Sequence, residues 1–128
     1  MAVLEVNAGR IVVTKRILTG GSVFLGWGTG SGTAAATDTD LFSPSSDESR
    51  VLCAVSQITT STTNDSLQIT ATMTCLNHPK TITNAGIFDS VGIGSPPSGG
   101  NLYLKANLTS QSLNVGDAIQ ISFVVQYS

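Results

Sequence analysis

The sequence predicts an all-β protein: a single antiparallel β-sandwich, jelly-roll-like, with about seven strands and negligible helix. Two segments carry most of this prediction. Large apolar side chains alternate with small or polar ones in residues 118–127, and they do so again in residues 67–76. A period of two is the pattern of a strand with one buried face. The other strand candidates follow at short intervals between turn residues, as is typical of sandwiches.

The two alternating segments predict the interior of the fold. They are expected to lie either on facing sheets or side by side in one sheet. The side chains predicted to point inward are Leu67, Ile69, Ala71, Met73 and Cys75 in the first segment, and Ile119, Ile121, Phe123, Val125 and Tyr127 in the second.

The chain is predicted to form one domain overall. Residues 1–20 are expected to form an N-terminal arm and a first edge strand, the strand-like part being residues 10–18, and residues 21–128 to form the sandwich. At 128 residues, such a domain buries roughly two thirds of its unfolded surface and needs no metal or disulfide to stabilise it. The remaining strands are expected at residues 22–27, 50–60, 81–89 and 102–108.

The connections are rich in Gly, Ser, Thr and Pro. Residues 33–50 predict a long irregular loop that Leu41 and Phe42 tuck onto the domain, and residues 90–100 predict a projecting loop. Gly86 predicts a β-bulge or a point of close approach. The acids of the first loop lack the spacing of a calcium-binding EF-hand, so they are expected to be solvated. They are Asp38, Asp40, Asp47 and Glu48.

Composition excludes several classes of partner. Charged residues make up 11% of the chain, against about 25% in an average domain, and Ser and Thr fill the gap. The net charge is −2 with one adjacent basic pair, Lys15-Arg16, so no nucleic acid is expected as a partner. No apolar run approaches the length of about 20 residues that a membrane span needs. The first residues show no secretion signal, so we expect synthesis in a cytoplasm.

The two cysteines, Cys53 and Cys75, both fall on predicted strands. If these strands form a hairpin, the two thiols lie opposite each other or one residue out of register, and the register decides which. Two interpretations therefore stay open: buried reduced thiols that pack as small apolar side chains, or one disulfide.

No catalytic, cofactor-binding or metal-ligating residue is predicted. The glycines of residues 26–32 fail the G-x-G-x-x-G pattern, and no Lys follows them as in a P-loop. They predict a flexible or tightly packed loop anchored by Trp27. His78, the single histidine, has no nucleophile or second ligand arranged with it in the sequence. No pair of carboxylates suitable for glycoside hydrolysis is evident, so an enzyme is not expected.

Three residues at loop or strand ends are candidates for contacts with a partner: Trp27, Phe42 and Arg50. For Trp27 and Phe42 the alternative is packing in the core. For Arg50 the alternative is a surface ion pair with Asp47 or Glu48, worth about 0–1 kcal/mol.

Three blocks of sequence carry a family resemblance. They are residues 26–30 (GWGTG) followed by Asp38-Thr39 and Arg50; residues 81–89 (TITNAGIFD); and residues 99–102 (GGNL) followed by Gly116-Asp117 and the C-terminal strand. In this order they resemble small β-rich virion structural proteins of tailed bacteriophages and prophages. The resemblance covers most of the chain from Phe24 onward. Residues 1–20 match no motif, and residues 90–100 are longer and richer in Pro than the resemblance implies.

The resemblance implies a function in the virion, with synthesis in the host cytoplasm. The leading hypothesis is a capsid decoration (cement) protein that forms a homotrimer and binds between subunits of the major capsid protein. The alternatives are a tail, neck or fibre component, or a glycan-binding β-sandwich module that would use Trp27 for stacking. No cofactor is implied.

Overall fold

The computed structural model describes residues 21–59 and 66–126, and this part of the chain contains seven strands and no helix. The strands form two antiparallel sheets, one of four strands and one of three. In chain order they are β1 (Phe24–Gly28), β2 (Val51–Leu52), β3 (Ala54–Ile58), β4 (Ser66–Thr74), β5 (Lys80–Phe88), β6 (Leu102–Leu113) and β7 (Ala118–Gln126). The predicted all-β class is therefore confirmed.

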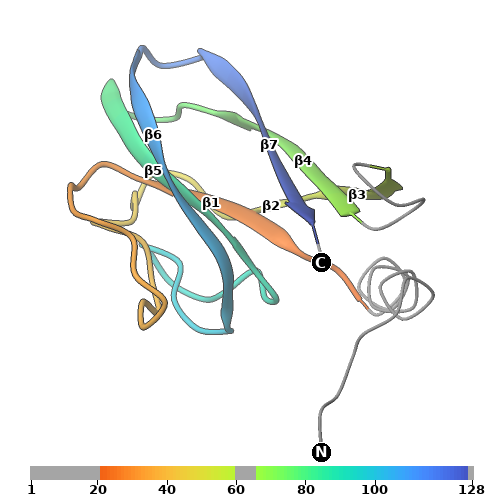
Figure 1. Ribbon diagram of the computed structural model, residues 1–128. Helices are drawn as coiled ribbons and strands as arrows, with labels where there is room; N and C mark the ends of the chain where they lie inside the picture. The colour runs from red at the N-terminus through yellow and green to blue at the C-terminus, as the bar shows by residue number, and fades with distance from the viewer. Residues whose placement is uncertain (1–20, 60–65, 127–128) are drawn as a thin grey trace, which may run out of the picture. The chain divides into compact units, whose positions relative to one another are not determined.

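The chain divides into two compact units. The larger unit comprises residues 22–53 and 71–120, and it contains the complete four-stranded sheet in the order β2-β1-β5-β6 (Figure 1). The smaller unit includes residues 54–70 and the chain from residue 121 onward. The central and final strands of the three-stranded sheet, β4 and β7, run through both units.

The four-stranded sheet has two faces of different character. In the antiparallel register Gly26 lies opposite Gly86, and Gly86 lies opposite Lys105, so these residues share a face. The other face carries apolar side chains that are buried, and it forms the core of the larger unit. They are Leu25, Trp27, Ala85 and Ile87.

The glycine face leaves space for a neighbouring loop to approach the sheet closely. A Cβ at Gly28 would collide with the carbonyl oxygen of Phe42, and one at Gly86 would lie 2.8 Å from Leu41 Cδ2. Gly86 is thus the point of close approach that the sequence predicted. The irregularities in the β5–β6 register lie elsewhere, between Ile82 and Asn84 and between Ile87 and Phe88.

In its described part, the smaller unit contains β3 paired with the first part of β4, and the last part of β7. Ala54 lies opposite Thr70 and Ile58 lies opposite Ser66. On its other side β4 is next to β7, where the hydroxyl oxygens Thr70 Oγ1 and Ser122 Oγ lie 2.8 Å apart, a hydrogen-bond distance.

The alternation predicted for the two strongest segments is confirmed. All five inward residues named on and just after β4 are buried, from Leu67 to Cys75. Along β7 each residue expected to point inward, namely Ile119, Ile121, Phe123 and Val125, is less exposed than its neighbours. Because β4 and β7 are adjacent in the order β3-β4-β7, they lie side by side in one sheet. Tyr127 lies outside the described residues.

Both cysteines are free thiols, Cys53 half-buried and Cys75 buried. The register explains why they do not meet. Ala54 pairs with Thr70, so continuing the ladder by one residue brings Cys53 to the level of Ala71, four residues short of Cys75. Burial raises the pKa of the Cys53 thiol to about 11.

Several expectations keep the status of predictions. The arm and edge strand expected at residues 1–20 lie outside the described residues, as do residues 60–65 between the strands expected at 50–60 and 67–76. The jelly-roll-like packing of the sheets and the single-domain organisation also stay predictions. Within residues 21–59 and 66–126, no helix has the length and apolar character that a bilayer crossing would need.

Candidate functional site

Two long loops of the larger unit are tied to the four-stranded sheet by a network of polar side chains. We call residues 29–50, between β1 and β2, loop L1, and residues 89–101, between β5 and β6, loop L2. L1 turns back along β1, because Gly30 N donates to Phe42 O at 2.9 Å and Ser45 N donates to Trp27 O at 3.1 Å. The second half of L1 therefore lies beside the strand that precedes it.

Glu48 is the centre of the first anchor. One carboxylate oxygen, Oε1, accepts hydrogen bonds from the Trp27 indole Nε1 at 2.7 Å and from Ser45 Oγ at 2.6 Å. The other, Oε2, accepts the Leu76 backbone N–H at 2.9 Å and forms an ion pair with Lys80. Burial alone would raise the pKa of Glu48, but these donors outweigh it, so the pKa lies below its ordinary value. Glu48 thus joins L1 to β1, β5 and the turn before β5.

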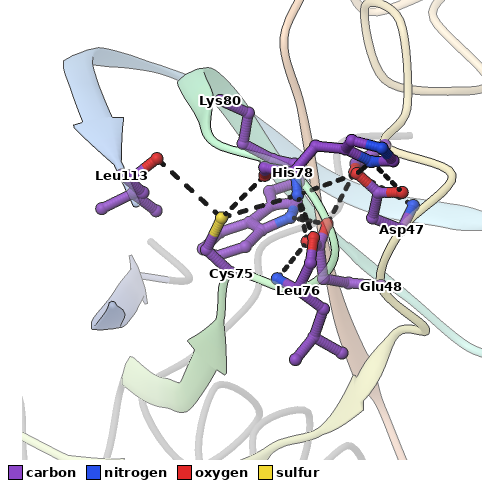
Figure 2. Close-up of polar contacts among 9 residues, drawn as sticks. Asp47, Glu48, Cys75, Leu76, His78, Lys80 and Leu113 are labelled. Carbon is purple, nitrogen blue, oxygen red and sulfur yellow. Dashed lines mark hydrogen bonds and ion pairs between the residues drawn. The ribbon is translucent and has the colours of Figure 1, made fainter. Parts of the chain in front are cut away.

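Lys80 is shared by two carboxylates. Figure 2 shows its side chain directed toward Glu48 and Asp47, with the His78 ring against Asp47. Lys80 Nζ lies 3.1 Å from Asp47 Oδ2 and donates to Leu76 O at 3.0 Å. Burial would lower the pKa of Lys80, but the hydrogen bonds to Glu48 and Asp47 raise it overall. The hydrogen bond from Lys80 lowers the pKa of Asp47, and that from His78 adds to this.

Asn84 forms the second anchor. Its side chain lies on β5, opposite Gly28, and is fully buried. The amide oxygen accepts the Phe42 N–H at 3.0 Å, and the amide nitrogen donates to Phe42 O at 3.0 Å. One amide therefore satisfies both backbone groups of a loop residue. A buried amide can do this only where the glycine face lets the loop approach.

Arg50 forms the third anchor and holds L2. Its guanidinium donates to Ser90 O at 3.0 Å, to Gly99 O at 2.8 Å and to Pro97 O at 3.4 Å. It also lies over the Phe88 ring, 3.5 Å from the ring centroid. The planar fork of Arg suits several carbonyl acceptors at once. Arg50 therefore connects the end of L1 to both ends of L2.

The base of L2 is closed by Asp89 and Asn101. The Asp89 carboxylate accepts the Asn101 backbone N–H at 2.6 Å and its side-chain amide at 2.8 Å. These hydrogen bonds lower the pKa of Asp89. Because Asp89 N also donates to Asn101 O at 3.1 Å, L2 leaves and re-enters the sheet at one fixed point.

Lys105 forms a fourth anchor, on β6. Its ammonium group binds Asp38 Oδ2 at 3.0 Å and Asp40 O at 2.8 Å, and it lies 3.3 Å from the Phe42 ring centroid. Nearby, Asn107 Nδ2 donates to Gly32 O at 2.9 Å. The first half of L1 is therefore held against the outer strand of the sheet.

The three residues named as interface candidates lie within this network. Trp27 is 2% exposed and Arg50 is 7% exposed, whereas Phe42 is half-buried. Packing in the core is thus what the structure shows for Trp27, and its ring face is not available for stacking on a sugar. The predicted tucking of L1 by Leu41 and Phe42 is confirmed. Contacts of these residues with a partner stay a prediction.

Two expectations about charged residues were wrong. Glu48 was expected to be solvated but is 6% exposed, because the donors of four other residues surround it. Arg50 was expected, if not at an interface, to form a surface ion pair with Asp47 or Glu48. It instead turns toward the carbonyl oxygens of L2. One local pattern could have indicated the burial of Glu48. A Ser lies three residues before it, and Ser45 does bind Glu48.

Every charged side chain of residues 21–59 and 66–126 has a bonding partner, although those of Asp40 and Asp117 bind only within their own turns. Each of the nine bonds to another group of the same chain; six of them are acids and three are basic. The acids are Asp38, Asp40, Asp47, Glu48, Asp89 and Asp117; the basic residues are Arg50, Lys80 and Lys105. In this part of the chain no group of three or more His, Cys, Asp or Glu side chains could hold a metal ion.

The hollows around the network are small or open. The space beside Trp27 and Arg50 measures about 10 Å³, room for about one water molecule. A surface hollow of about 360 Å³ lies over Asp47 and His78, and one of about 330 Å³ lies between L1 and β6. The network therefore acts on the shape of the loops, and two of its charged residues, Glu48 and Arg50, are buried.

Comparison with known proteins finds no family model that matches the chain and no significant match among curated proteins.

Proposed function

We propose that the protein is a structural component of a bacteriophage virion, a capsid decoration (cement) protein that binds between major capsid subunits as a homotrimer. The observation that carries this proposal is that Glu48, Lys80, Arg50 and Lys105 hold L1 and L2 against the sheet. A protein built in this way presents loops of fixed shape. Fixed loops lose little conformational entropy when they bind, which favours recognition by shape complementarity.

The exposed surface supports the same proposal. Its large apolar side chains include Val91 and Ile93 of L2, which are 47% and 80% exposed. L2 contains one charged residue, Asp89, and it is bound to Asn101. Apolar side chains on a loop of fixed shape are suited to a complementary hollow on a partner.

The sequence blocks that carry the resemblance to virion proteins also meet in the network. The first block supplies Trp27 and Arg50, the second supplies Asn84 and Asp89, and the third supplies Asn101. The resemblance thus rests on residues that fix the loops, which is what a family of shape-recognising structural proteins would retain in common.

The physical benefit to the particle is linkage. A protein that binds the assembled lattice and not its dissociated subunits stabilises the assembled state by RT ln(1 + [L]/Kd). At a free concentration 100-fold above Kd this amounts to about 2.7 kcal/mol per site. No reaction centre is needed for this function.

The test is co-sedimentation of the purified protein with tail-less phage heads that lack their own decoration protein. We expect saturable binding and a higher temperature of head disruption in calorimetry. Ile93→Asp should weaken binding at least tenfold, whereas Ser46→Asp, on an exposed part of L1, should not. Binding to isolated tails and not to heads would contradict the cement function. Binding to neither would contradict a virion function altogether.

A further inference from the structure

The hollow between L1 and β6 has features of a binding site for an extended polypeptide. We call it the β6 groove; it is lined by Ala34, Ala35, Ala36 and Asp38 on one side and by residues 102–105 on the other. The L1 segment that forms its wall is fixed at both ends, through Gly32 to Asn107 and through Asp38 to Lys105. Between these two ties the wall carries three alanines, which leave about 330 Å³ open. This volume is within the range of ligand clefts.

The floor of the β6 groove is the edge of a sheet. Among the strands of residues 21–59 and 66–126, β6 has a neighbour on one side in the order β2-β1-β5-β6, and it is twelve residues long. Proteins protect such edges with free Lys side chains or prolines. β6 contains no proline, and its one charged residue, Lys105, is turned toward Asp38 and the Phe42 ring. The opposite edge, β2, is two residues long. A partner strand at β6 would therefore cover the longer of the two edges of this sheet.

An added strand is recognised through its main chain, with side chains accommodated alternately on either side. Residues 104–107 pair regularly with residues 84–87, between the two irregularities of the β5–β6 register. This regular part of β6 provides a template. The alanine wall accepts the side chains of an added strand on one side because it presents only methyl groups.

Charge identifies the occupant. The described residues carry three basic and six acidic side chains, a net charge of −3, whereas residues 1–20 carry Arg10, Lys15 and Arg16 against Glu5, a net charge of +2. Within that basic segment, residues 10–18 have the alternating, β-branched pattern of a strand. Asp40, two residues beyond the wall residue Asp38, is exposed, and its carboxylate offers an opposite charge to the basic groups of residues 10–18.

We propose that residues 10–18 of a second copy of this chain bind in the β6 groove as an added strand and join the copies of the homo-oligomer. The inference deepens the proposed function, because it states how the copies are held together. It is tested without capsids, so its outcome is separate from that of the head-binding experiment.

The test uses disulfide trapping between full-length chains, in a Cys53→Ser background to remove the half-buried thiol. One variant carries Ala35→Cys in the groove wall. Its partners carry Val13→Cys or Thr14→Cys, whose side chains point to opposite faces of a strand. Each is mixed with the Ala35→Cys variant, which bears an affinity tag. We expect one of the two mixtures to give a tagged–untagged dimer on oxidation. The control replaces Ala35→Cys by Ser112→Cys, and the dimer yield should be at least tenfold higher than in this control.

A double variant distinguishes exchange between copies from binding within one chain. If Val13→Cys and Ala35→Cys combined in one chain give a cross-linked monomer at low concentration, the segment occupies its own groove and the proposal is overturned. A yield no higher than that of the Ser112→Cys control also overturns it. As a second measurement, Val13→Pro should shift the native mass from oligomer to monomer with Trp27 fluorescence unchanged. If this variant remains oligomeric, another surface joins the copies. Head binding retained alongside either negative result would leave the cement function standing.

Discussion

The indole Nε1 of Trp27 donates a 2.7 Å hydrogen bond to Glu48 Oε1 across 21 residues of sequence, and both side chains are buried. The bond joins β1 to the far end of L1. It can form only when the loop has folded back on the strand, so it reports on the closed state of L1. Because Trp27 is the single tryptophan, its fluorescence provides a direct measurement of that state.

Glu48→Gln should destabilise the protein by about 2 to 3 kcal/mol, since it leaves the Lys80 ammonium group buried with one carboxylate in place of two. The amide keeps the shape of the side chain and one oxygen acceptor, so the loss reports on charge. Urea unfolding followed by Trp27 fluorescence measures it. Ser46→Ala, at an exposed position of the same loop, should change stability by no more than about 0.5 kcal/mol. Equal unfolding midpoints for the two variants would show that Glu48 is not an anchor.

Stability should fall at acidic and at strongly alkaline pH, for two separate reasons. The folded-state pKa values of Asp47 and Glu48 lie below their ordinary values of 3.8 and 4.5. Their contribution is therefore present above those values and is lost as the pH falls through the lowered pKa. The folded-state pKa of Lys80 lies above 10.5, so its contribution is lost as the pH rises through the raised pKa. Unfolding midpoints measured from pH 3 to pH 11 should show a plateau between about pH 5 and pH 10. An acid limb unchanged by Glu48→Gln would contradict this assignment.

Local periodicity located the strands of the described residues, but residues 50–60, expected as one strand, form two, β2 and β3, in different sheets. Alternation in β4 and β7 identified both the strand and its buried face, and turn residues identified most boundaries. The pairing of strands and the burial of loops depend on contacts between distant residues. Periodicity carries no information on these contacts. The sequence therefore left open whether β4 and β7 lie on facing sheets or side by side in one sheet.

The candidate site was harder to predict for the same reason. Acids in a long polar loop are usually solvated, and Glu48 differs because Leu76 and Lys80, 28 and 32 residues away, supply donors. The glycines at positions 26, 28 and 86 gave a usable signal. Gly86 predicted a bulge or a close approach, and residues 26–32 a flexible or tightly packed loop; the loop that packs against these glycines is L1.

Arg50→Lys should release L2 even though it keeps the charge. Lys cannot bind the carbonyl oxygens of Ser90 and Gly99 in the planar geometry of Arg, and it loses the stacking on Phe88. We expect a loss of about 1.5 to 3 kcal/mol, with faster hydrogen exchange in residues 90–100. Ser49→Ala, at the neighbouring exposed position, serves as the control. Unchanged exchange in L2 would show that Asp89 and Asn101 alone fix the loop.

The two thiols should differ in their reaction with an aromatic disulfide reagent. Cys53 is half-buried with a pKa of about 11, so its labelling should be slow at pH 7 and should rise about tenfold per pH unit up to pH 10, as the thiolate fraction grows. Cys75 is fully buried and should react only when the protein unfolds. Labelling of Cys53→Ser therefore measures global opening. Equal rates for the two thiols in the native protein would contradict this burial pattern.

Gly28→Ala and Gly26→Ala provide a matched pair that tests whether the glycine face determines the position of L1. The two residues are two positions apart on β1 and share a face. A Cβ at Gly26 would lie 3.4 Å or more from its neighbours, which is ordinary contact, whereas one at Gly28 would collide with Phe42 O and lie 3.0 Å from Asn84 Nδ2. Because backbone and a buried amide cannot move aside cheaply, Gly28→Ala should cost about 1 to 3 kcal/mol. It should also disturb the hydrogen bonds between Asn84 and Phe42. Gly26→Ala should change stability by less than about 1 kcal/mol. Thermal unfolding measures the stability of both variants, and amide exchange at Phe42 gives the local measurement. Equal effects of the two variants would mean that L1 is positioned by its side chains alone.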